Sequence, residues 1–149
     1  MTQTFPIECR QAAPSDYDEM LQLWERSVIA THSFLSAEAR EAIRLEIPSY
    51  FPQLEVQLWY LHGAMLGFSA IHEGHLEMLF LDPESIGKGY GKQIMQQLLA
   101  TFGVKSVDVN KDNPKALAFY QKNGFAIVRE SPTDGAGRPY PILHLALER

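Results

Sequence analysis

The sequence is poor in the features that mark disulfide-stabilised and membrane-spanning proteins. Its 149 residues include a single cysteine, Cys9, so no intramolecular disulfide can form. We expect this thiol to be a buried structural residue of the first strand rather than a nucleophile. No run approaches the ~20 apolar residues that a membrane-spanning helix needs. Residues 1–6 contain neither a basic region nor an apolar segment with a cleavage site, which predicts no signal peptide and a cytoplasmic protein.

The chain also lacks an excess of positive charge. Thirteen Lys and Arg stand against eighteen Asp and Glu, for a net charge of −5, which argues against a general nucleic-acid binder. The charge is unevenly spread, because residues 88–122 contain six lysines and two aspartates. This segment is either a solvated helix face or a region that attracts a phosphorylated ligand.

Apolar periodicity and turn residues predict alternating strands and helices along the chain. The predicted strands are 7–11, 56–62, 65–72, 76–81, 106–109, 125–129 and 142–147. Four helices are predicted, beginning at Pro14, at Ser36, after the glycine-rich segment 87–91, and at Pro114. The second of them is predicted to end at Ile47, because Pro48 follows. The order β-α-α-β-β-β-α-β-α-β-β over a single domain, residues 1–149, indicates the α/β (α+β) class, with helices packed on one mixed sheet.

The segment 87–91 has the composition of an anion-binding loop. Glycines at 87, 89 and 91 precede an amphipathic helix, whose N-terminus presents unpaired N–H groups to a phosphate. The Walker pattern of nucleotide-binding loops fails at two positions. Position 82 is Asp where this pattern needs Gly, and Lys88 is followed by Gly89 where it needs Ser or Thr. The dinucleotide pattern also fits poorly, because its third glycine would fall on Lys92. The alternative is an ordinary glycine-rich turn.

Two segments resemble the GNAT N-acetyltransferases. Leu81-Asp82-Pro83 with Gly87-Lys88-Gly89-Tyr90-Gly91 is similar to motif A of that superfamily, and the segment from Val109 to Phe125 is similar to its motif B. The segments 30–35 and 139–141 are similar to YjaB-type bacterial members. The resemblance implies a GNAT fold, with a mostly antiparallel seven-stranded sheet and four helices, and a protein that transfers the acetyl group of acetyl-CoA to an amine.

The resemblance also implies which residues bind acetyl-CoA, the co-substrate. Backbone amides of the loop and two nearby lysines would hold the pyrophosphate, strand residues would offer main-chain groups to the pantetheine arm, and an asparagine would add a polar contact. The expected cofactor-binding residues are Phe80, Leu81, Ile86, Gly87, Lys88, Gly89, Tyr90, Gly91, Lys92, Asn113 and Tyr120. Ile86 departs from the family, which usually has Arg or Gln there, so binding should depend more on Lys88 and Lys92.

Direct attack by an amine sets two proton-transfer tasks. An alkylamine with a pKa of ~10.4 is neutral about once in 2,500 at pH 7, a deficit of roughly 4.6 kcal/mol unless a base removes its proton. Glu77 is the leading candidate base, followed by His75 and His32. Strand alternation predicts that His75 and Glu77 share a face with Leu79. Tyr120 matches the family position of the donor that protonates the leaving thiolate.

The acceptor amine is not specified by the sequence. The loops 32–35, 50–51 and 131–140 are rich in aromatic residues, and the last is long for a hairpin, so we expect them to contact the acceptor. We expect no metal, no nucleic acid and no membrane among the partners. The oligomeric state is not decided, and a homodimer is one option. A GNAT-like acyl-CoA sensor without turnover is the alternative function, and a nucleotide-dependent oxidoreductase is a remote one.

Overall fold

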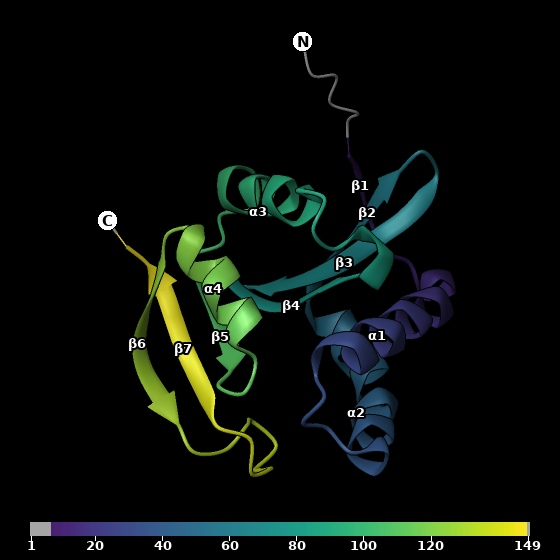
Figure 1. Cartoon of the computed structure of the whole chain (residues 1–149). Coiled ribbons are helices and arrows are strands. Elements are labelled where there is room, and N and C mark those ends of the chain that lie inside the picture. The colour runs from purple at the N-terminus through teal and green to yellow at the C-terminus, as the bar shows by residue number, and fades with distance from the viewer. Residues whose placement is uncertain (1–6, 149) are drawn as a thin grey trace.

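A computed structural model describes residues 7–148 and contains one seven-stranded sheet. The strand order is β1-β2-β3-β4-β5-β7-β6, and all neighbours are antiparallel except the parallel pair β4 and β5. This arrangement confirms the predicted element order and the GNAT fold (Figure 1). The first six residues, which predict no signal peptide, lie outside the described residues. The strands are β1 Glu8–Gln11, β2 Glu55–Leu61, β3 Ala64–His72, β4 His75–Leu81, β5 Ser106–Asn110, β6 Phe125–Ser131 and β7 Ile142–Leu147.

Helices cover both sides of this sheet. They are α1 Tyr17–Thr31, α2 Ala37–Tyr50, α3 Tyr90–Ala100 and α4 Pro114–Lys122, with single 3-10 turns at Pro14–Asp16, Phe51–Gln53 and Pro83–Ser85. Ser36 caps α2 as predicted, because its Oγ accepts from the amide of Ala39. The predicted end at Ile47 is wrong, since α2 continues through Pro48 to Tyr50. Proline disrupts only the last turn here, and the burial of Ile47 and Phe51 on either side holds that turn against the core.

Two apolar clusters form the core, one for each pair of helices. The first gathers α3 and α4 residues, among them Ile94 and Leu98, with Val107 and Val109 of β5. The second gathers α1 residues such as Trp24 with Leu58 and Phe68 of β2 and β3 and Ile47 of α2. Along α1 the buried apolar side chains include Met20, Leu21, Trp24 and Val28. On this face α1 packs on β3 and β4, and α2 packs on α1, so these helices leave the part of the face at β5 to β7 uncovered.

The sheet opens between its two central strands. β4 and β5 pair only at His75 with Ser106 and at Leu76 with Val107, after which β4 continues to Leu81 without this neighbour. Figure 1 shows β4 and β5 diverging, with α4 beside the opening. A strand that loses its neighbour presents unpaired N–H and C=O groups to a ligand. The opening therefore leaves the main chain of residues 78–81 accessible from one side.

The edge strand β1 corrects the expectation for Cys9. This strand pairs only with β2, and all four of its residues are exposed, Cys9 included. Alternation in sequence could not reveal that the strand lies at the margin of the sheet, where neither face is well covered. Among residues 7–148, no helix has both the length and the apolar character needed to cross a membrane.

Candidate active site

A bulge in β4 determines which side chains face the opening between β4 and β5. Ala70 of β3 pairs with Met78, whereas the next residue, Ile71, pairs with Leu76, so Glu77 is the additional residue. Leu76 and Leu79 consequently both pack on the cluster under α3 and α4. His75 and Glu77 share the opposite face, as predicted, but the prediction that Leu79 lies on their face is wrong. A β-bulge breaks the alternation of period two on which that prediction depended.

The glycine-rich loop leads into an uncapped helix N-terminus. Gly89 is the N-cap of α3, its φ is +84°, and within residues 7–148 no side chain bonds to the first-turn amides. By contrast, side chains of Ser36 and Asn113 cap α2 and α4. A residue with a Cβ is strained at this φ, and the first-turn N–H groups of a helix lack backbone partners. The loop therefore offers free amides and a positive dipole end to an anion.

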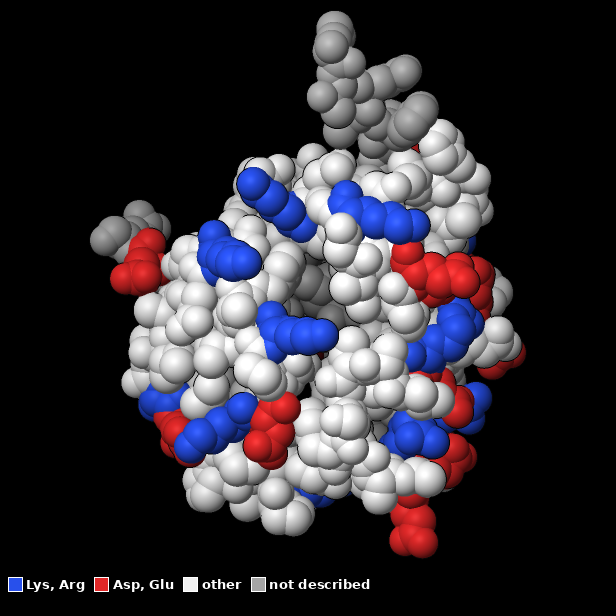
Figure 2. Space-filling view, in the orientation of Figure 1, with Lys and Arg blue, Asp and Glu red and all other residues white. Residues whose placement is uncertain are grey.

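Lys88 and Lys92 flank this helix terminus, and Lys115 and Lys122 lie on α4. Lys88, Lys92, Lys115 and Lys122 are all exposed, and Figure 2 shows basic side chains around a central hollow on this face. The start of the loop is held in place from α1, because Arg26 donates to Asp82 Oδ2 at 2.7 Å while Asp82 Oδ1 accepts from the amide of Glu84. Sequence reasoning did not identify Arg26, since nothing local relates it to residue 82.

Two adjacent pockets meet at the opening. One, about 220 Å³, extends toward Ile86, Lys115 and Phe119, and the other, about 120 Å³, extends toward Glu77 and Asp108. Both are lined by His32, Leu79, Phe80, Asn113, Ala116 and Tyr120. The first pocket lies on the side of the glycine-rich loop and the second on the face where β5 is uncovered. A molecule held on one side can thus present an end group to the other.

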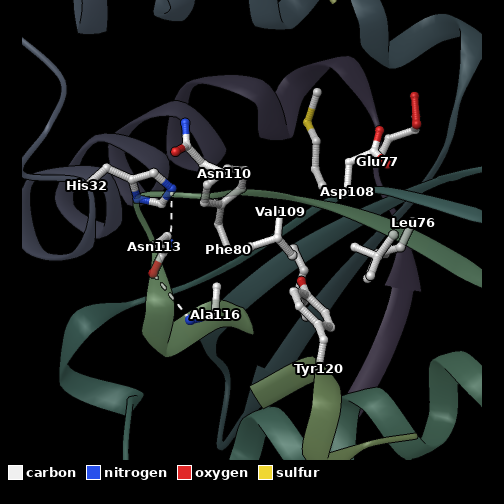
Figure 3. A pocket seen from close by; sticks show the side chains of 13 residues that line it. His32, Leu76, Glu77, Phe80, Asp108, Val109, Asn110, Asn113, Ala116 and Tyr120 are labelled. Carbon is white, nitrogen blue, oxygen red and sulfur yellow. Dashed lines mark hydrogen bonds between the residues drawn. The ribbon is translucent and has the colours of Figure 1, made fainter. Parts of the chain in front are cut away.

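Tyr120 lies where the two pockets meet. Its side chain is 7% exposed and its ring packs edge-on against Phe119 and Phe125. Figure 3 shows the hydroxyl pointing from α4 toward the middle of the smaller pocket. No partner for this hydroxyl lies among residues 7–148, and burial raises the pKa of Tyr120 well above its ordinary value. A neutral phenol with an unused proton suits the thiol end of coenzyme A.

His32 and Asn113 form the opposite wall of the smaller pocket (Figure 3). Thr31 Oγ1 donates to Ser27 O and lies 2.7 Å from His32 Nδ1, so the ring N–H at Nδ1 must be the donor to Thr31. The unprotonated Nε2 faces Asn113 Nδ2 at 3.5 Å, while Asn113 Oδ1 caps α4 by accepting from Ala116 N. Burial lowers the pKa of His32. The side-chain amide of Asn113, which is predicted to contact the cofactor, therefore already has a partner at its nitrogen and another at its oxygen.

His75, Glu77 and Asp108 form a cluster on the open face of the sheet. His75 Nε2 lies 3.5 Å from Glu77 Oε2 and 3.4 Å from Asp108 Oδ2. The hydrogen bond to Asp108 raises the pKa of His75. Burial opposes ionisation of Asp108, but hydrogen bonds from His75 and His144 outweigh it and hold the pKa of this carboxyl below its usual range. Of the three candidate bases, Glu77 and His32 line the smaller pocket, and His75 stands behind Glu77.

Further residues reach this region from distant parts of the chain. Arg138, in the loop between β6 and β7, bonds to Glu46 of α2, and the ring of Tyr140 lies 6.0 Å from that of Phe34. The loop 131–141 is thereby joined to α2 and to the loop after α1. The sequence showed the length of this loop but not its contacts. Within the described part of the chain, no three or more His, Cys, Asp or Glu side chains are grouped to hold a metal ion.

Comparisons with known proteins agree with this geometry. Residues 55–127 match the family described as the acetyltransferase (GNAT) domain. The chain is 35% identical over 143 residues to the peptidyl-lysine N-acetyltransferase YjaB of Escherichia coli K12, covering 94% of this chain and 96% of that protein. It is 33% identical over 121 residues to the peptidyl-lysine N-acetyltransferase YiaC of the same organism, covering 80% and 83%. The solution structure of apo-form YjaB superposes with a TM-score of 0.86 at 33% identity, over 95% of this chain and 97% of the other. The chain belongs to the GNAT acetyltransferase family.

Proposed function

We propose that this acetyl-CoA-dependent N-acetyltransferase modifies the side-chain amine of lysine residues in proteins. The observation that carries the proposal is the meeting of two pockets at the unpartnered hydroxyl of Tyr120, one on the cofactor-loop side and one on the open face. The lysine acceptor is supported by the names of YjaB and YiaC, which match at least four-fifths of the chain. An acyl-CoA sensor without turnover is not favoured, because these relatives are named as transferases.

The cofactor side is proposed to hold acetyl-CoA through backbone groups. Amides of 87–92 would bind the pyrophosphate, with Lys88 and Lys92 adding charge, and the unpaired main chain of Phe80 and Leu81 would pair with the amide-bearing arm. Ile86 is 48% exposed and lines the larger pocket, so it contributes apolar contact where the family usually has a polar side chain. Asn113 would act on the cofactor indirectly, by setting the position of α4.

The chemistry assigned to the chain consists of two proton transfers. Glu77, which lines the smaller pocket, would take the proton of the acceptor ammonium. Tyr120 would donate to the thiolate as it leaves, and its raised pKa keeps the phenol protonated at any working pH. His32 is the weaker candidate for the base, because Asn113 already engages its unprotonated nitrogen.

The acceptor side is proposed to receive a protein segment. The smaller pocket opens on the sheet face that α1 and α2 leave uncovered, and the loops containing Phe34 and Tyr140 lie beside it. A lysine side chain is long and thin enough to reach a buried thioester from a surface of this kind. The predicted cytoplasmic location, the absence of a metal and of nucleic-acid partners, and the option of a homodimer stay predictions of the sequence.

Matched peptides test the acceptor. Thiol release from acetyl-CoA would be followed with a peptide containing lysine and an acetylated N-terminus, and with the same peptide in which arginine replaces lysine and the N-terminus is free. We expect release with the first only, and mass spectrometry should place the acetyl group on Nζ. Turnover confined to the free N-terminus, or to free amino acids and polyamines, would overturn the lysine assignment.

A further inference from the structure

The cluster behind Glu77 extends across three strands. From β4 to β5 to β7 it runs through His75, Asp108 and His144, and a serine hydroxyl lies beside each histidine. His144 Nδ1 lies 2.7 Å from Asp108 Oδ1, and its Nε2 lies 2.7 Å from Ser131 Oγ. Because a carboxylate can only accept, Nδ1 must carry a hydrogen, and in the neutral ring Ser131 then donates to Nε2. Asp108 is therefore held by a donor whose direction is set.

His75 is placed to act through Glu77 rather than on the substrate. Glu77 and Asp108 line the pocket that contains Tyr120, whereas His75 is absent from that lining. Its Nδ1 lies 2.6 Å from Ser106 Oγ, and its Nε2 is shared between the two carboxylates at 3.4 and 3.5 Å. The side chain is 28% exposed, so a proton that reaches the ring can leave to water.

We propose that His75 takes up the proton that Glu77 removes from the acceptor amine and releases it at the open face of the sheet, with Asp108 and His144 as positioning residues. This inference rests on the proposed transfer to an amine. It gives the chain a path by which the proton leaves on the side away from the cofactor. The amine would approach Glu77 from the smaller pocket, and the proton would leave Glu77 through His75.

The proton balance closes with groups on the chain and water. The acceptor ammonium gives one proton to the Glu77 carboxylate, and the neutral amine then attacks the thioester carbon. In the neutral His75 tautomer that carries its hydrogen on Nδ1, facing Ser106 Oγ, Nε2 is free to accept this proton from the Glu77 carboxylic acid, which restores the carboxylate. The imidazolium, stabilised by Asp108, loses the proton to solvent. At a pH below the pKa of His75 the ring is already protonated and cannot accept, so this path closes.

The charged groups around His75 come from every neighbouring strand. On β4 it faces Glu77 and on β5 Asp108, with His144 of β7 behind Asp108. Its cross-strand partner on β3, His72, is directed to Glu73 at 3.8 Å, and on β6 Arg129 pairs with His144. Lys105 precedes Ser106 and packs beside Gly74. Asp108 is the group whose hydrogen bond has the largest effect on His75.

The test compares pH–rate profiles with ring titrations. In Asp108→Asn, we expect the NMR titration midpoint of His75 to fall by about one pH unit, and the acid limb of kcat to move to lower pH with it. In His75→Gln, we expect kcat to fall about tenfold, because a positioned proton acceptor is lost, with the KM for acetyl-CoA unchanged. The matched control His72→Gln removes an exposed histidine beside a glutamate and should leave the profile unchanged.

Two results would overturn the relay. If the His75 titration moves in Asp108→Asn while the acid limb stays in place, the proton does not pass through His75. If the titration itself does not move, the two side chains are not coupled. The kinetic arm uses whichever amine gives thiol release in a screen, so a protein that ignores lysine peptides would overturn the proposed acceptor and still test the relay.

Discussion

His32 Nε2 lies 3.5 Å from Asn113 Nδ2, so the end of α1 meets the start of α4 across the smaller pocket. The orientation of both groups is determined by their other bonds, to Thr31 and to Ala116. Protonation of His32 would set an N–H against the amide NH₂ of Asn113. This contact should therefore exist only with the neutral ring.

The lowered pKa of His32 predicts a stability that falls in acid. The unfolded chain binds the proton near pH 6.5 while the folded chain resists it, so stability is complete above this pH and decreases below it, by up to about 1.4 kcal/mol for each unit of pKa lowering. Thermal unfolding at pH 5 and 7.5 should show a smaller acid loss in His32→Gln than in wild type. Thr31→Val, which keeps the ring, should retain most of that loss. Equal acid losses in wild type and His32→Gln would contradict this prediction.

Removal of the Tyr120 hydroxyl should separate activity from stability. In Tyr120→Phe we expect kcat to fall about a hundredfold, the lower end for a positioned acid. The melting temperature should stay close to wild type, because this hydroxyl has no partner among residues 7–148. The matched control is Tyr17→Phe. The Tyr17 ring packs on Phe51, with 4.7 Å between the ring centroids, and Tyr17 lines neither pocket. Wild-type kcat across the pH range in Tyr120→Phe would refute the donor role.

The features that could be predicted from the sequence are those that depend on a local pattern of residues. Pro114 begins α4 and Ser36 caps α2 as predicted, because capping and proline placement are decided within a few residues. The bulge at Glu77 was not predictable, since it arises from the pairing of β4 with β3. For the same reason Asp108 and His144, 36 residues apart, showed no local sign of contact.

Exposed lysines beside an uncapped helix should strengthen cofactor binding in a salt-dependent way. Calorimetric titration of acetyl-CoA into Lys88→Ala/Lys92→Ala should give about two- to thirtyfold weaker affinity than wild type at low salt, with the difference shrinking as salt screens it. Lys111→Ala is the control, because this exposed lysine pairs with Glu130 at 3.1 Å. Equal affinity in wild type and the double variant would show that backbone amides suffice.

The conformation of Gly89 should matter to binding as well as to folding. Gly89 has φ +84° and Gly63, in the β2–β3 hairpin, has φ +78°, and a Cβ at either position would meet open space. Each glycine-to-alanine change should therefore destabilise the fold by the same amount, about 1–2 kcal/mol of left-handed strain. Only Gly89→Ala should raise the KM for acetyl-CoA, because only that strain tilts the first-turn amides of α3. If both variants left this KM at the wild-type value, the loop would not be the pyrophosphate site, since the amides would have moved without consequence.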